Sequence, residues 1–552
     1  MNSRPPTSDF FAVADLEYHE SVASVGDGDL WPSTWADDGY LYTANGDGLG
    51  FSDGPWLDIV VNRVEGDPLR GLSGQRLAGG RDVSPIWTDP SRFNSKPTGM
   101  VAVDGNGDGR DEVYLAVQDL RCGDHPDVFN EAPAAGIVRS EDGGATWTPS
   151  DGPLFADHRF TTVFFLDFGQ SNTHARVLGH NPTDYVYAYG LDYNWRASFS
   201  GCVPDPTDLY LARVPGASIQ ERGTWEFFAG LDQGGSPRWT ADIGRKAPVL
   251  TDRRRCYVPR ADTKGLGSGP APSGTYIAQG GVTYIPAFDR YVYTSWSDCV
   301  WVFYEAPAPW GPWREFLLQD FGPPPWTGPG SSDPKHGGYG VTMPSKFLSP
   351  DGREAWIQSN WFGGAATYTG NTYHFSLRRL QLAPAPSEPS GGYGDWVAPG
   401  QPGPEVNLAR HGAHPIAVTF RSGHAEVLND GRTDLAEDSW NGTEKHRDFW
   451  GYTWAEPVRL NRLVYVTGPH DWTSGFFAAP PRVEYRAGGK WVPAVNVHVS
   501  PKYPQWFAST GNRAYTFRFD AVTTTGVRIA GEPTGFHQWY SAIAELEVYF
   551  DR

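Results

Sequence analysis

The sequence predicts an all-β protein, and three observations lead to this prediction. Aromatic residues make up 14% of the 552 residues, and they are interspersed with 66 Gly and 47 Pro. A hairpin format, two strand-like runs around a Gly- and Asp-rich turn, recurs five times. The composition then changes sharply at residues 383–405. Short aromatic strands separated by turns are typical of β domains, and the change in composition marks a domain boundary.

The first hairpin spans residues 26–48 and reads GDGDLWPSTWADDGYLYTANGDG. An Asp-Gly pair lies midway, which is a strong turn signal between two strand-like runs. A turn centred there opposes Asp29 to Gly48 and brings Asp29 and Asp47 to one rim of a sheet, about 5–8 Å apart at Cβ. Two carboxyls at this spacing suit glycoside hydrolysis, in which one protonates the leaving oxygen and the other activates water or attacks the sugar.

Such chemistry needs apolar walls that keep one carboxyl protonated, and aromatic residues such as Trp31 and Trp56 are close by in sequence. The alternative is that Asp and Gly simply end the strands. That alternative explains Asp37 and Asp38 better, since they belong to the turn. Asp29 and Asp47 remain the candidate acid/base pair.

The other four hairpins fall at unequal intervals in the first two thirds of the chain. They span residues 97–119, 161–194, 280–298 and 338–361. About 75 residues per unit matches a four-stranded blade with long loops, and blades repeated around an axis form a propeller. We therefore expect a five-bladed β-propeller. Residues 140–147, SEDGGATW, fit the Asp-box turn of sialidase-type propellers, which is a structural turn away from the substrate face.

The segment 383–405 is dominated by Pro, Gly and Ser, as in a semi-extended linker. The predicted organisation is a catalytic propeller over 1–382, this linker, and a second domain over 406–552.

Charge and composition limit the partners. The net charge of −19 argues against nucleic acid, which needs a basic surface, and is compatible with a neutral glycan. No apolar run is long enough to cross a membrane. The first residues lack the apolar core of a signal peptide, so the chain is either cytosolic or exported by a signal that is absent from it; we expect an extracellular monomer. The four Cys form either two disulfides or none: Cys122, Cys202, Cys256 and Cys299.

Residues 406–552 resemble the discoidin, or coagulation-factor type C, fold and its carbohydrate-binding relatives. The resemblance is carried by NLARHGAHPIAV (407–418), AEVLNDGRTD (425–434), PPRVEYRAGGKWVPA (480–494) and most specifically GVRIAGEPTGFHQWYSAIAELEVYF (526–550). It implies an eight-stranded jelly-roll sandwich.

The same resemblance implies two sites. A structural calcium would be held by Asp430, Thr433 and Glu545, although an ordinary Asn-Asp-Gly turn is the alternative. Aromatic rings in the loops would stack on a sugar, and for each of them burial in the sandwich is the alternative. The candidates are Trp472, Trp506 and Trp539.

Residues 26–48 and 338–361 resemble a bacterial propeller family, formerly of unknown function, that includes endo-D-arabinanases acting on mycobacterial arabinogalactan and lipoarabinomannan. The resemblance spans roughly residues 20–382. It implies a five-bladed propeller, inversion at the anomeric carbon, and an acid/base pair that corresponds to Asp29 and Asp47. No cofactor is expected for catalysis.

Residues at the rims of the hairpins are expected to face a central cavity and bind substrate: Trp31, Trp56, Asp119, Asp192, Asn194, Asp298, His336, Asn360 and Trp361. Lys96, Arg196 and Lys246 flank these strands and are candidates for binding sugar hydroxyls. Asp167, within an apolar run, is expected either to line the site or to form a salt bridge. Residues 104–112 have the ligand spacing of a calcium loop, but a plain turn is favoured there.

Three functions remain open from the sequence. They are a glycosidase acting on furanose polymers, most simply an endo-D-arabinanase; a sialidase-like or other exo-glycosidase; and a glycan-binding protein without catalysis. The carboxyl spacing estimated from the hairpin overlaps the ranges for retention, about 5–5.5 Å, and inversion, about 6.5–9.5 Å.

Overall fold

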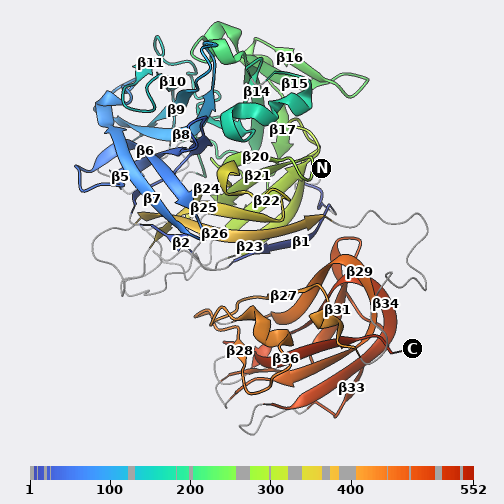
Figure 1. The fold of residues 1–552 in the computed structure, drawn as a ribbon. Helices are drawn as coiled ribbons and strands as arrows, with labels where there is room; N and C mark the ends of the chain where they lie inside the picture. Colours follow the sequence, from blue (N-terminus) through green and yellow to red (C-terminus); the bar gives the residue numbers. More distant parts are fainter. Residues whose placement is uncertain are drawn as a thin grey trace. The chain divides into compact units, whose positions relative to one another are not determined.

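The computed structural model is built mostly of β-strands with short 3-10 helices (Figure 1). It describes residues 5–8, 10–17, 22–24, 26–121, 131–181, 183–197, 203–256, 274–297, 300–320, 338–362, 373–384, 406–443, 445–470, 474–503, 512–534 and 539–551. Within these ranges, no helix has the length and apolar character needed to cross a membrane.

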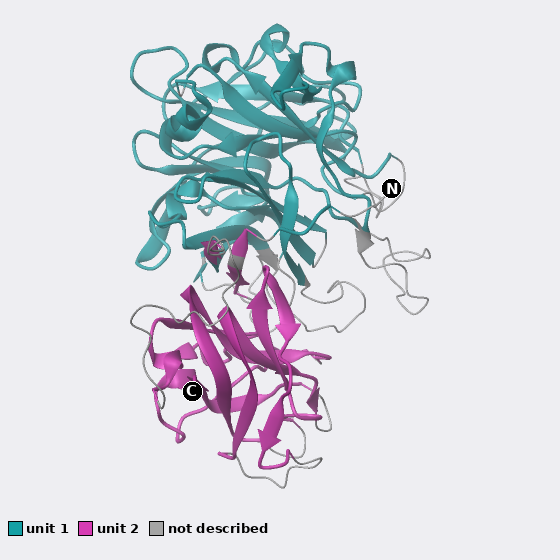
Figure 2. Cartoon of the chain, turned by 90° about the vertical axis from the view of Figure 1, so that its right-hand side faces the viewer, with its two compact units in different colours: residues 1–8, 19–381 teal, residues 9–18, 382–552 magenta. Residues whose placement is uncertain are grey.

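The chain divides into two compact units, coloured separately in Figure 2. Unit 1 comprises Met1–Ser8 and His19–Gln381, and unit 2 comprises Asp9–Tyr18 and Leu382–Arg552. The division after Gln381 falls next to the predicted one. The segment Asp9–Tyr18, which contains β1 (Phe11–Leu16), groups with unit 2, whereas the sequence assigned it to the first domain.

Unit 1 contains five groups of antiparallel strands that follow one another along the chain (Figure 1). The first is β3 (Asp27–Asp29), β4 (Ser33–Trp35), β5 (Leu41–Gly50), β6 (Leu57–Asp67) and β7 (Gly71–Gly79); the second is β8 (Phe93–Val103), β9 (Glu112–Arg121), β10 (Ala135–Ser140) and β11 (Thr148–Pro149). The third is β12 (Thr162–Asp167), β13 (Val186–Leu191), β14 (Asp208–Val214), β15 (Glu226–Leu231), β16 (Pro237–Thr240) and β17 (Pro248–Thr251); the fourth is β20 (Gly281–Ile285), β21 (Arg290–Ser297), β22 (Val300–Ala306) and β23 (Arg314–Asp320). The fifth is β24 (Tyr339–Thr342), β25 (Glu354–Phe362) and β26 (Tyr373–Pro384), with β2 (Val22–Ala23) beside β26.

Smaller elements connect these groups. β18 (Arg255–Cys256) pairs with β19 (Gly274–Thr275). The 3-10 helices of unit 1 are η1 (Gly80–Asp82), η2 (Gln170–Leu178), η3 (Gly216–Ser218), η4 (Arg222–Thr224), η5 (Ile243–Arg245) and η6 (Ser345–Phe347). A short parallel pairing of β12 with β20 joins the third and fourth groups into one sheet.

Each of the five predicted hairpins is present. The pairs are β4–β5, β8–β9, β12–β13, β20–β21 and β24–β25, all antiparallel. The predicted Asp-box turn joins β10 to β11. There the Ser140 hydroxyl accepts from Gly144 N at 2.8 Å, and the Asp142 carboxylate accepts from Thr146 N at 2.9 Å. The Trp147 indole donates to the Gly144 carbonyl at 3.0 Å, which closes the turn.

The register of the first hairpin differs from the predicted one. Leu30 and Trp31 have left-handed backbone angles, φ 73° and 52°, so the strand breaks there and both β3 and β4 pair with β5. Asp29 consequently lies opposite Gly46, and the predicted pairing with Gly48 is wrong. A uniform register cannot include such a break, because left-handed angles are rare for Leu and Trp and carry no sequence signal.

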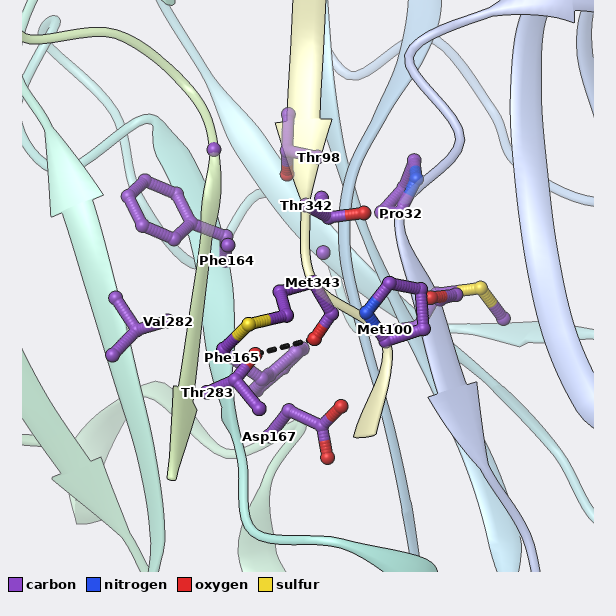
Figure 3. A pocket seen from close by; sticks show the side chains of 15 residues that line it. Pro32, Thr98, Met100, Phe164, Phe165, Asp167, Val282, Thr283, Thr342 and Met343 are labelled. Carbon is purple, nitrogen blue, oxygen red and sulfur yellow. Dashed lines mark hydrogen bonds between the residues drawn. The ribbon is translucent and has the colours of Figure 1, made fainter. Parts of the chain in front are cut away.

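A small cavity is lined by residues from all five groups (Figure 3). Its volume is about 30 Å³, which holds roughly two water molecules. Figure 3 shows the hydrogen bond from the Thr283 hydroxyl to the Met343 carbonyl, 2.6 Å, across its wall. Each group contributes lining residues: 32–33, 98–100, 164–165 with Asp167, 280–283 and 342–344.

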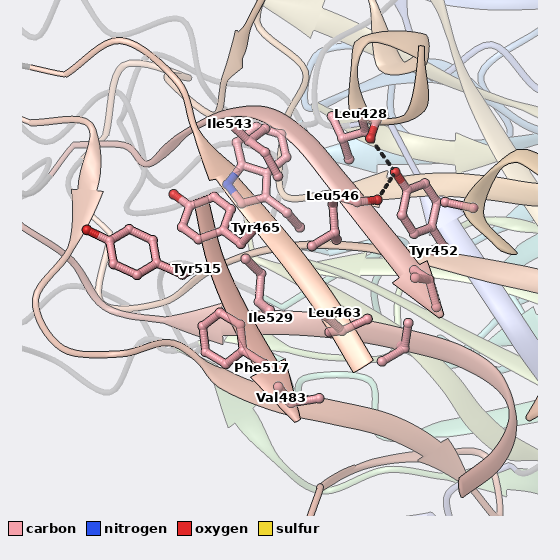
Figure 4. Packing of buried hydrophobic residues seen from close by; sticks show 14 of the residues in the cluster. Leu428, Tyr452, Leu463, Tyr465, Val483, Tyr515, Phe517, Ile529, Ile543 and Leu546 are labelled. Atoms are coloured by element: carbon pink, nitrogen blue, oxygen red, sulfur yellow. Dashed lines mark hydrogen bonds between the residues drawn. The ribbon is translucent and has the colours of Figure 1, made fainter. Parts of the chain in front are cut away.

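Unit 2 is a curled antiparallel sheet around a large apolar core (Figure 4). Its long strands β29 (Asp448–Thr467) and β34 (Ala514–Gly531) pair with each other, and the buried Tyr452 hydroxyl donates to the Leu428 and Leu546 carbonyls. The remaining elements are β27 (Ala413–Ala417), β28 (Glu437–Asp438), β30 (Phe476–Phe477), β31 (Arg482–Ala487), β32 (Lys490–Pro493), β33 (His498–Ser500), β35 (Pro533–Thr534), β36 (Ala542–Tyr549), η7 (Leu408–Arg410) and η8 (Ala425–Asn429).

Candidate active site

Asp29 is a buried carboxylic acid at the end of β3. Only 6% of the residue is exposed. Its Oδ2 accepts a hydrogen bond from the Tyr339 hydroxyl at 2.8 Å, and its Oδ1 has no hydrogen-bond partner in the described part of the chain. Burial and the neighbouring Asp47 raise the pKa of Asp29 to about 6, although Lys96, Tyr339 and Arg196 oppose the rise. An acid with this pKa can both hold and release a proton near neutral pH.

Asp47 lies beside Asp29 and forms an ion pair with Lys96 of β8. The Asp47 side chain is 19% exposed, so this carboxylate reaches solvent, whereas the Lys96 side chain is only 2% exposed. Burial lowers the pKa of Lys96, but the charges of Asp47 and Asp29 outweigh burial and raise it above its usual value. Two acids and one ammonium therefore form a compact charged cluster.

Gly46 makes this cluster sterically feasible. A Cβ atom at Gly46 would lie 2.3 Å from Asp29 Oδ1 and 3.3 Å from Lys96 Nζ. The Asp29 carboxyl and the Lys96 ammonium thus converge on a residue of β5 that has no side chain. Any larger residue would displace one of them.

Aromatic side chains enclose the cluster. The Tyr339 ring lies 5.6 Å from Trp195, 5.5 Å from Trp296 and 6.0 Å from Tyr373, measured between ring centroids. Burial raises the pKa of the Tyr373 hydroxyl, and Asp29 and Asp47 raise it further, which places Tyr373 near both acids. This is the apolar environment that the acid/base hypothesis requires.

Three buried amides with unpaired polar atoms lie near the cluster. Gln118 is opposite Lys96 on the β8–β9 ladder, and its Oε1 accepts from Thr162 while its Nε2 has no partner among the described residues. Gln279 donates to the Pro97 carbonyl, and its Oε1 is unpaired. Asn360 is opposite Tyr339, and neither atom of its amide has a partner. Buried amides are normally satisfied, so these groups indicate a site that binds polar atoms.

Several predicted substrate-binding residues contact other residues of the protein instead. Trp31 is 0% exposed and packs against Phe51 and Phe375, which leaves no surface for a sugar. Asp119 is fully buried and accepts hydrogen bonds from the Trp87 and Thr88 backbone, which anchors that loop.

Asp192 and Asn194 are likewise held by the protein itself. The Asp192 carboxylate pairs with Lys246 at 2.9 Å and accepts from Phe160 N. This interaction uses Lys246, which the sequence offered as a sugar ligand. The Asn194 side-chain oxygen accepts from Trp195 N at 2.9 Å. Trp56, by contrast, is 58% exposed.

Some predicted residues cannot be placed. Asp298, His336, Trp472 and Trp506 lie outside the described residues, as does the side chain of Trp361. Of the predicted site residues in unit 1, the structure brings together Asp29, Asp47 and Asn360, together with Lys96 and Arg196.

Sequence reasoning missed Gln118, Gln279, Tyr339 and Tyr373. Gln118 could have been found from strand alternation, because residues opposite each other on a ladder share a face and Lys96 faces Gln118 rather than Asp119. Tyr339 lies at the start of the fifth predicted hairpin, but its approach to Asp29 depends on strands more than 300 positions apart.

Asp167 lines the small cavity of Figure 3, which is not the candidate site. Its carboxylate accepts from Ser345 N and Gly169 N, both at 2.9 Å, and burial raises its pKa. The cavity is too small for a sugar, so the candidate site is the Asp29 cluster and not this cavity.

The carboxylates at Asp104, Asp108 and Glu112 each offer an oxygen within 4.8 Å of the other two. They accept hydrogen bonds from Gly107 N, Arg110 N and Gly105 N of their own loop. These are the interactions of a plain turn, which the sequence favoured here.

In unit 2, the predicted calcium ligands Asp430 and Glu545 lie close enough to interact. Burial, together with Asp430, raises the pKa of Glu545 to about 7, and its carboxylate accepts from Gly431 N. The Arg410 guanidinium lies 3.8 Å from Glu545. Thr433 is exposed on the same loop. Two neighbouring carboxyls and a hydroxyl are oxygen ligands of the kind that calcium prefers, so the residues fit this ion.

Trp539, a predicted sugar contact, is half-buried and lies 4.8 Å from the Trp440 ring. Lys445 donates to the backbone carbonyls of Ser439 and Trp539, which fixes the two segments that carry these rings.

No protein-family model and no curated protein matches the chain. Solved structures resemble it at low identity. A GH43_1 enzyme from Xanthomonas citri is 14% identical over 66% of this chain and 89% of its own, with a TM-score of 0.33. CpGH89CBM32-5 from Clostridium perfringens, in complex with GalNAc-β-1,3-galactose, is 15% identical over 26% of this chain and 99% of its own, with a TM-score of 0.21. A family 32 CBM of Clostridium perfringens NanJ, in complex with galactose, is 16% identical over 26% and 97%, with a TM-score of 0.20. The chain is thus distantly similar in structure to a glycoside hydrolase and to carbohydrate-binding modules, and similarity at this level shows no shared substrate.

Proposed function

We propose that unit 1 is a five-bladed β-propeller that hydrolyses glycosidic bonds, with Asp29 as the general acid and Asp47 as the general base. The observation that carries the proposal is the Asp29 carboxyl. It is buried, it has one oxygen without a partner, its pKa is raised to about 6, and a second carboxylate lies beside it. The five sequential strand groups around one cavity support the propeller.

The two acids differ in the way the reaction requires. Asp29, enclosed by aromatic rings, holds a proton that it can give to the glycosidic oxygen as the bond breaks. Asp47 is paired with Lys96 and partly exposed, so its carboxylate is the one placed to take a proton from an attacking water. The proposed inversion follows from the resemblance of residues 26–48 and 338–361 to the arabinanase-containing family; in this mechanism a water fits between the second carboxylate and the sugar.

We propose a furanosidic polysaccharide as the substrate and endo-D-arabinanase as the activity. The resemblance of residues 26–48 and 338–361 to the arabinanase-containing family supports this choice. The buried amides Gln118, Gln279 and Asn360 support a neutral, hydroxyl-rich ligand, because an amide can donate to and accept from hydroxyls.

The test is hydrolysis of a panel of D-arabinans, L-arabinans and a fluorogenic sialoside by the full chain and its variants. Asp29→Asn and Asp47→Asn should each lower the release of reducing ends from D-arabinan by about 1,000-fold or more, since each removes one of two essential proton transfers. Asp192→Asn is the matched control, because Asp192 also pairs with a buried lysine. Full activity of both Asn variants contradicts the assignment. Proton NMR of the first anomer released decides between inversion and retention.

We further propose that unit 2 is a discoidin-like jelly-roll module that binds the same glycan and holds a structural calcium at Asp430, Thr433 and Glu545. The raised pKa of Glu545 beside Asp430 supports a bound cation, since a divalent ion would relieve the repulsion of the two carboxyls. Chelation with EDTA should lower the melting temperature of unit 2, and added calcium should restore it. Glu545→Gln should remove this response, whereas an unchanged melting curve in EDTA argues against the ion.

A further inference from the structure

Lys96 occupies an unusual position for a lysine. Its side chain is almost fully buried, it forms an ion pair with Asp47, and its Nζ lies over the same face of Gly46 as Asp29 Oδ1. Three strands supply the cluster: β3 carries Asp29, β5 carries Asp47 and β8 carries Lys96. Burying an ammonium costs several kcal/mol unless it is paired, so structure alone would favour an apolar residue here.

We propose that Lys96 is a positioning residue that decides which of the two acids carries the proton. This inference rests on the proposed function. By pairing with Asp47, Lys96 keeps that carboxylate ionised as the base and directed toward the side that reaches solvent. Asp29, whose Oδ1 has no partner, is left to take the proton and act as the acid.

The charge of the cluster explains why one lysine is sufficient to place the proton on Asp29. Two carboxylates and one ammonium carry a net charge of −1, and a single proton makes the cluster neutral. Because Asp47 already has its counter-ion, the proton is held most favourably on Asp29. Without Lys96, two carboxyls would face each other in a buried site and share one proton, with neither role assigned.

Other charged and titratable groups also face the cluster. Asp58 raises the pKa of Lys96 and accepts a hydrogen bond from Ser95 N. Arg196 lowers the pKa of Asp29. The hydroxyls of Tyr339 and Tyr373 also lie near the acids. Arg196 lies over the Trp195 ring at 4.9 Å. The ion pair that Asp47 forms in the described part of the chain is with Lys96.

The experiment compares the full chain with Lys96→Met in two readouts. One is the pH profile of kcat/KM on D-arabinan; the other is the carboxyl titration of ¹³C-labelled Asp by NMR, with Asp29 assigned through Asp29→Asn. Loss of the ammonium should move the Asp29 titration and both limbs of the profile upward by about one pH unit or more. Lys96→Arg, which keeps the charge, should leave the titration near that of the parent chain.

Two further variants separate this role from a structural one. Lys246→Met removes another lysine with a buried side chain that is paired with an aspartate, and it should lower stability without moving the Asp29 titration. Lys96→Met with Asp47→Asn removes the pair without leaving an unpaired charge, so it folds even where the single variant does not. In it the Asp29 titration should return toward that of the parent chain.

An Asp29 titration that is the same in Lys96→Met and the parent chain overturns the inference. A parent chain without activity on any glycan tested contradicts the proposed function instead, while the NMR titration still decides the role of Lys96.

Discussion

Asp29 is buried when the chain folds, and its burial affects the stability of the folded chain as well as the proposed catalysis. Its ordinary pKa of 3.8 rises to about 6 in the folded chain, chiefly through burial. Between these two values the folded chain holds a proton that the unfolded chain has released. Stability from this group is therefore fully present below pH 3.8 and is lost as the pH rises through about 6.

Asp29→Asn should remove this pH dependence. Relative to the parent chain, the variant should gain about 3 kcal/mol in the free energy of unfolding of unit 1 between pH 4 and pH 7, as an upper estimate. Urea denaturation at several pH values measures the difference. A difference between variant and parent that stays constant over this range would mean that Asp29 has an ordinary pKa.

Gly46→Ala tests the geometry of the acid pair without changing any charge. The new Cβ would contact Asp29 Oδ1 at 2.3 Å and Lys96 Cδ at 3.1 Å, so the carboxyl must move. A displacement of about 1 Å at a reacting group costs roughly 100-fold in rate. Gly223→Ala is the control, since nothing lies within 4 Å of its Cβ. Equal kcat in the two variants would refute this prediction.

The residues that could be predicted from sequence are those whose roles are local. Asp29 and Asp47 belong to one hairpin and are 18 positions apart. The Asp-Gly turn signal between them therefore predicts that they lie close together. Lys96 and Tyr339 reach the cluster from other strand groups, and only the arrangement of those groups brings them there. Trp31 was misplaced because an aromatic residue next to a candidate acid can equally face the core, and here it does.

At the scale of the element, the break between β3 and β4 matters most. The left-handed angles at Leu30 and Trp31 turn the chain so that Asp29 stays at the rim while Trp31 enters the core. The hairpin was predictable from its Asp-Gly turn, and the break was not, since its cause is burial of Leu30 and Trp31 rather than a glycine. Such strained backbone often occurs beside functional sites.

The β10–β11 turn gives a prediction in which stability changes and activity does not. Asp142 accepts from Thr146 N at 2.9 Å and from the Thr146 hydroxyl at 2.6 Å. Asp142→Ala should therefore destabilise unit 1 by about 1–2 kcal/mol, the usual effect of losing two hydrogen bonds at a turn. It should leave kcat unchanged, because the Asp-box is structural. Asp151→Ala, at an exposed neighbouring position, is the control. A loss of activity without a loss of stability would show that the turn contributes to the site.

At the scale of the whole molecule, the chain combines two all-β units. Unit 1 holds the Asp29, Asp47 and Lys96 cluster beside its apolar cores, and unit 2 has an apolar core with two paired, half-buried aromatic rings at Trp440 and Trp539. The division after Gln381 lies next to the change in composition at residues 383–405. No local pattern in the sequence indicates that Asp9–Tyr18 groups with unit 2.

The roles proposed for the two units predict that glycan binding and hydrolysis can be separated by point variants of the full chain. Trp440→Ala and Trp539→Ala should each weaken binding to insoluble arabinan about tenfold, equivalent to about 1.4 kcal/mol of lost stacking on sugar faces. The loops should keep their positions, because Lys445 holds them through backbone carbonyls. Hydrolysis of soluble oligosaccharides should remain at the parent rate, since the acid pair lies in unit 1. Val495→Ala, at an exposed apolar position of unit 2, should bind as the parent chain does. Sedimentation with the polysaccharide and turnover of soluble substrate measure the two properties, and the prediction fails if the tryptophan variants bind as tightly as the control.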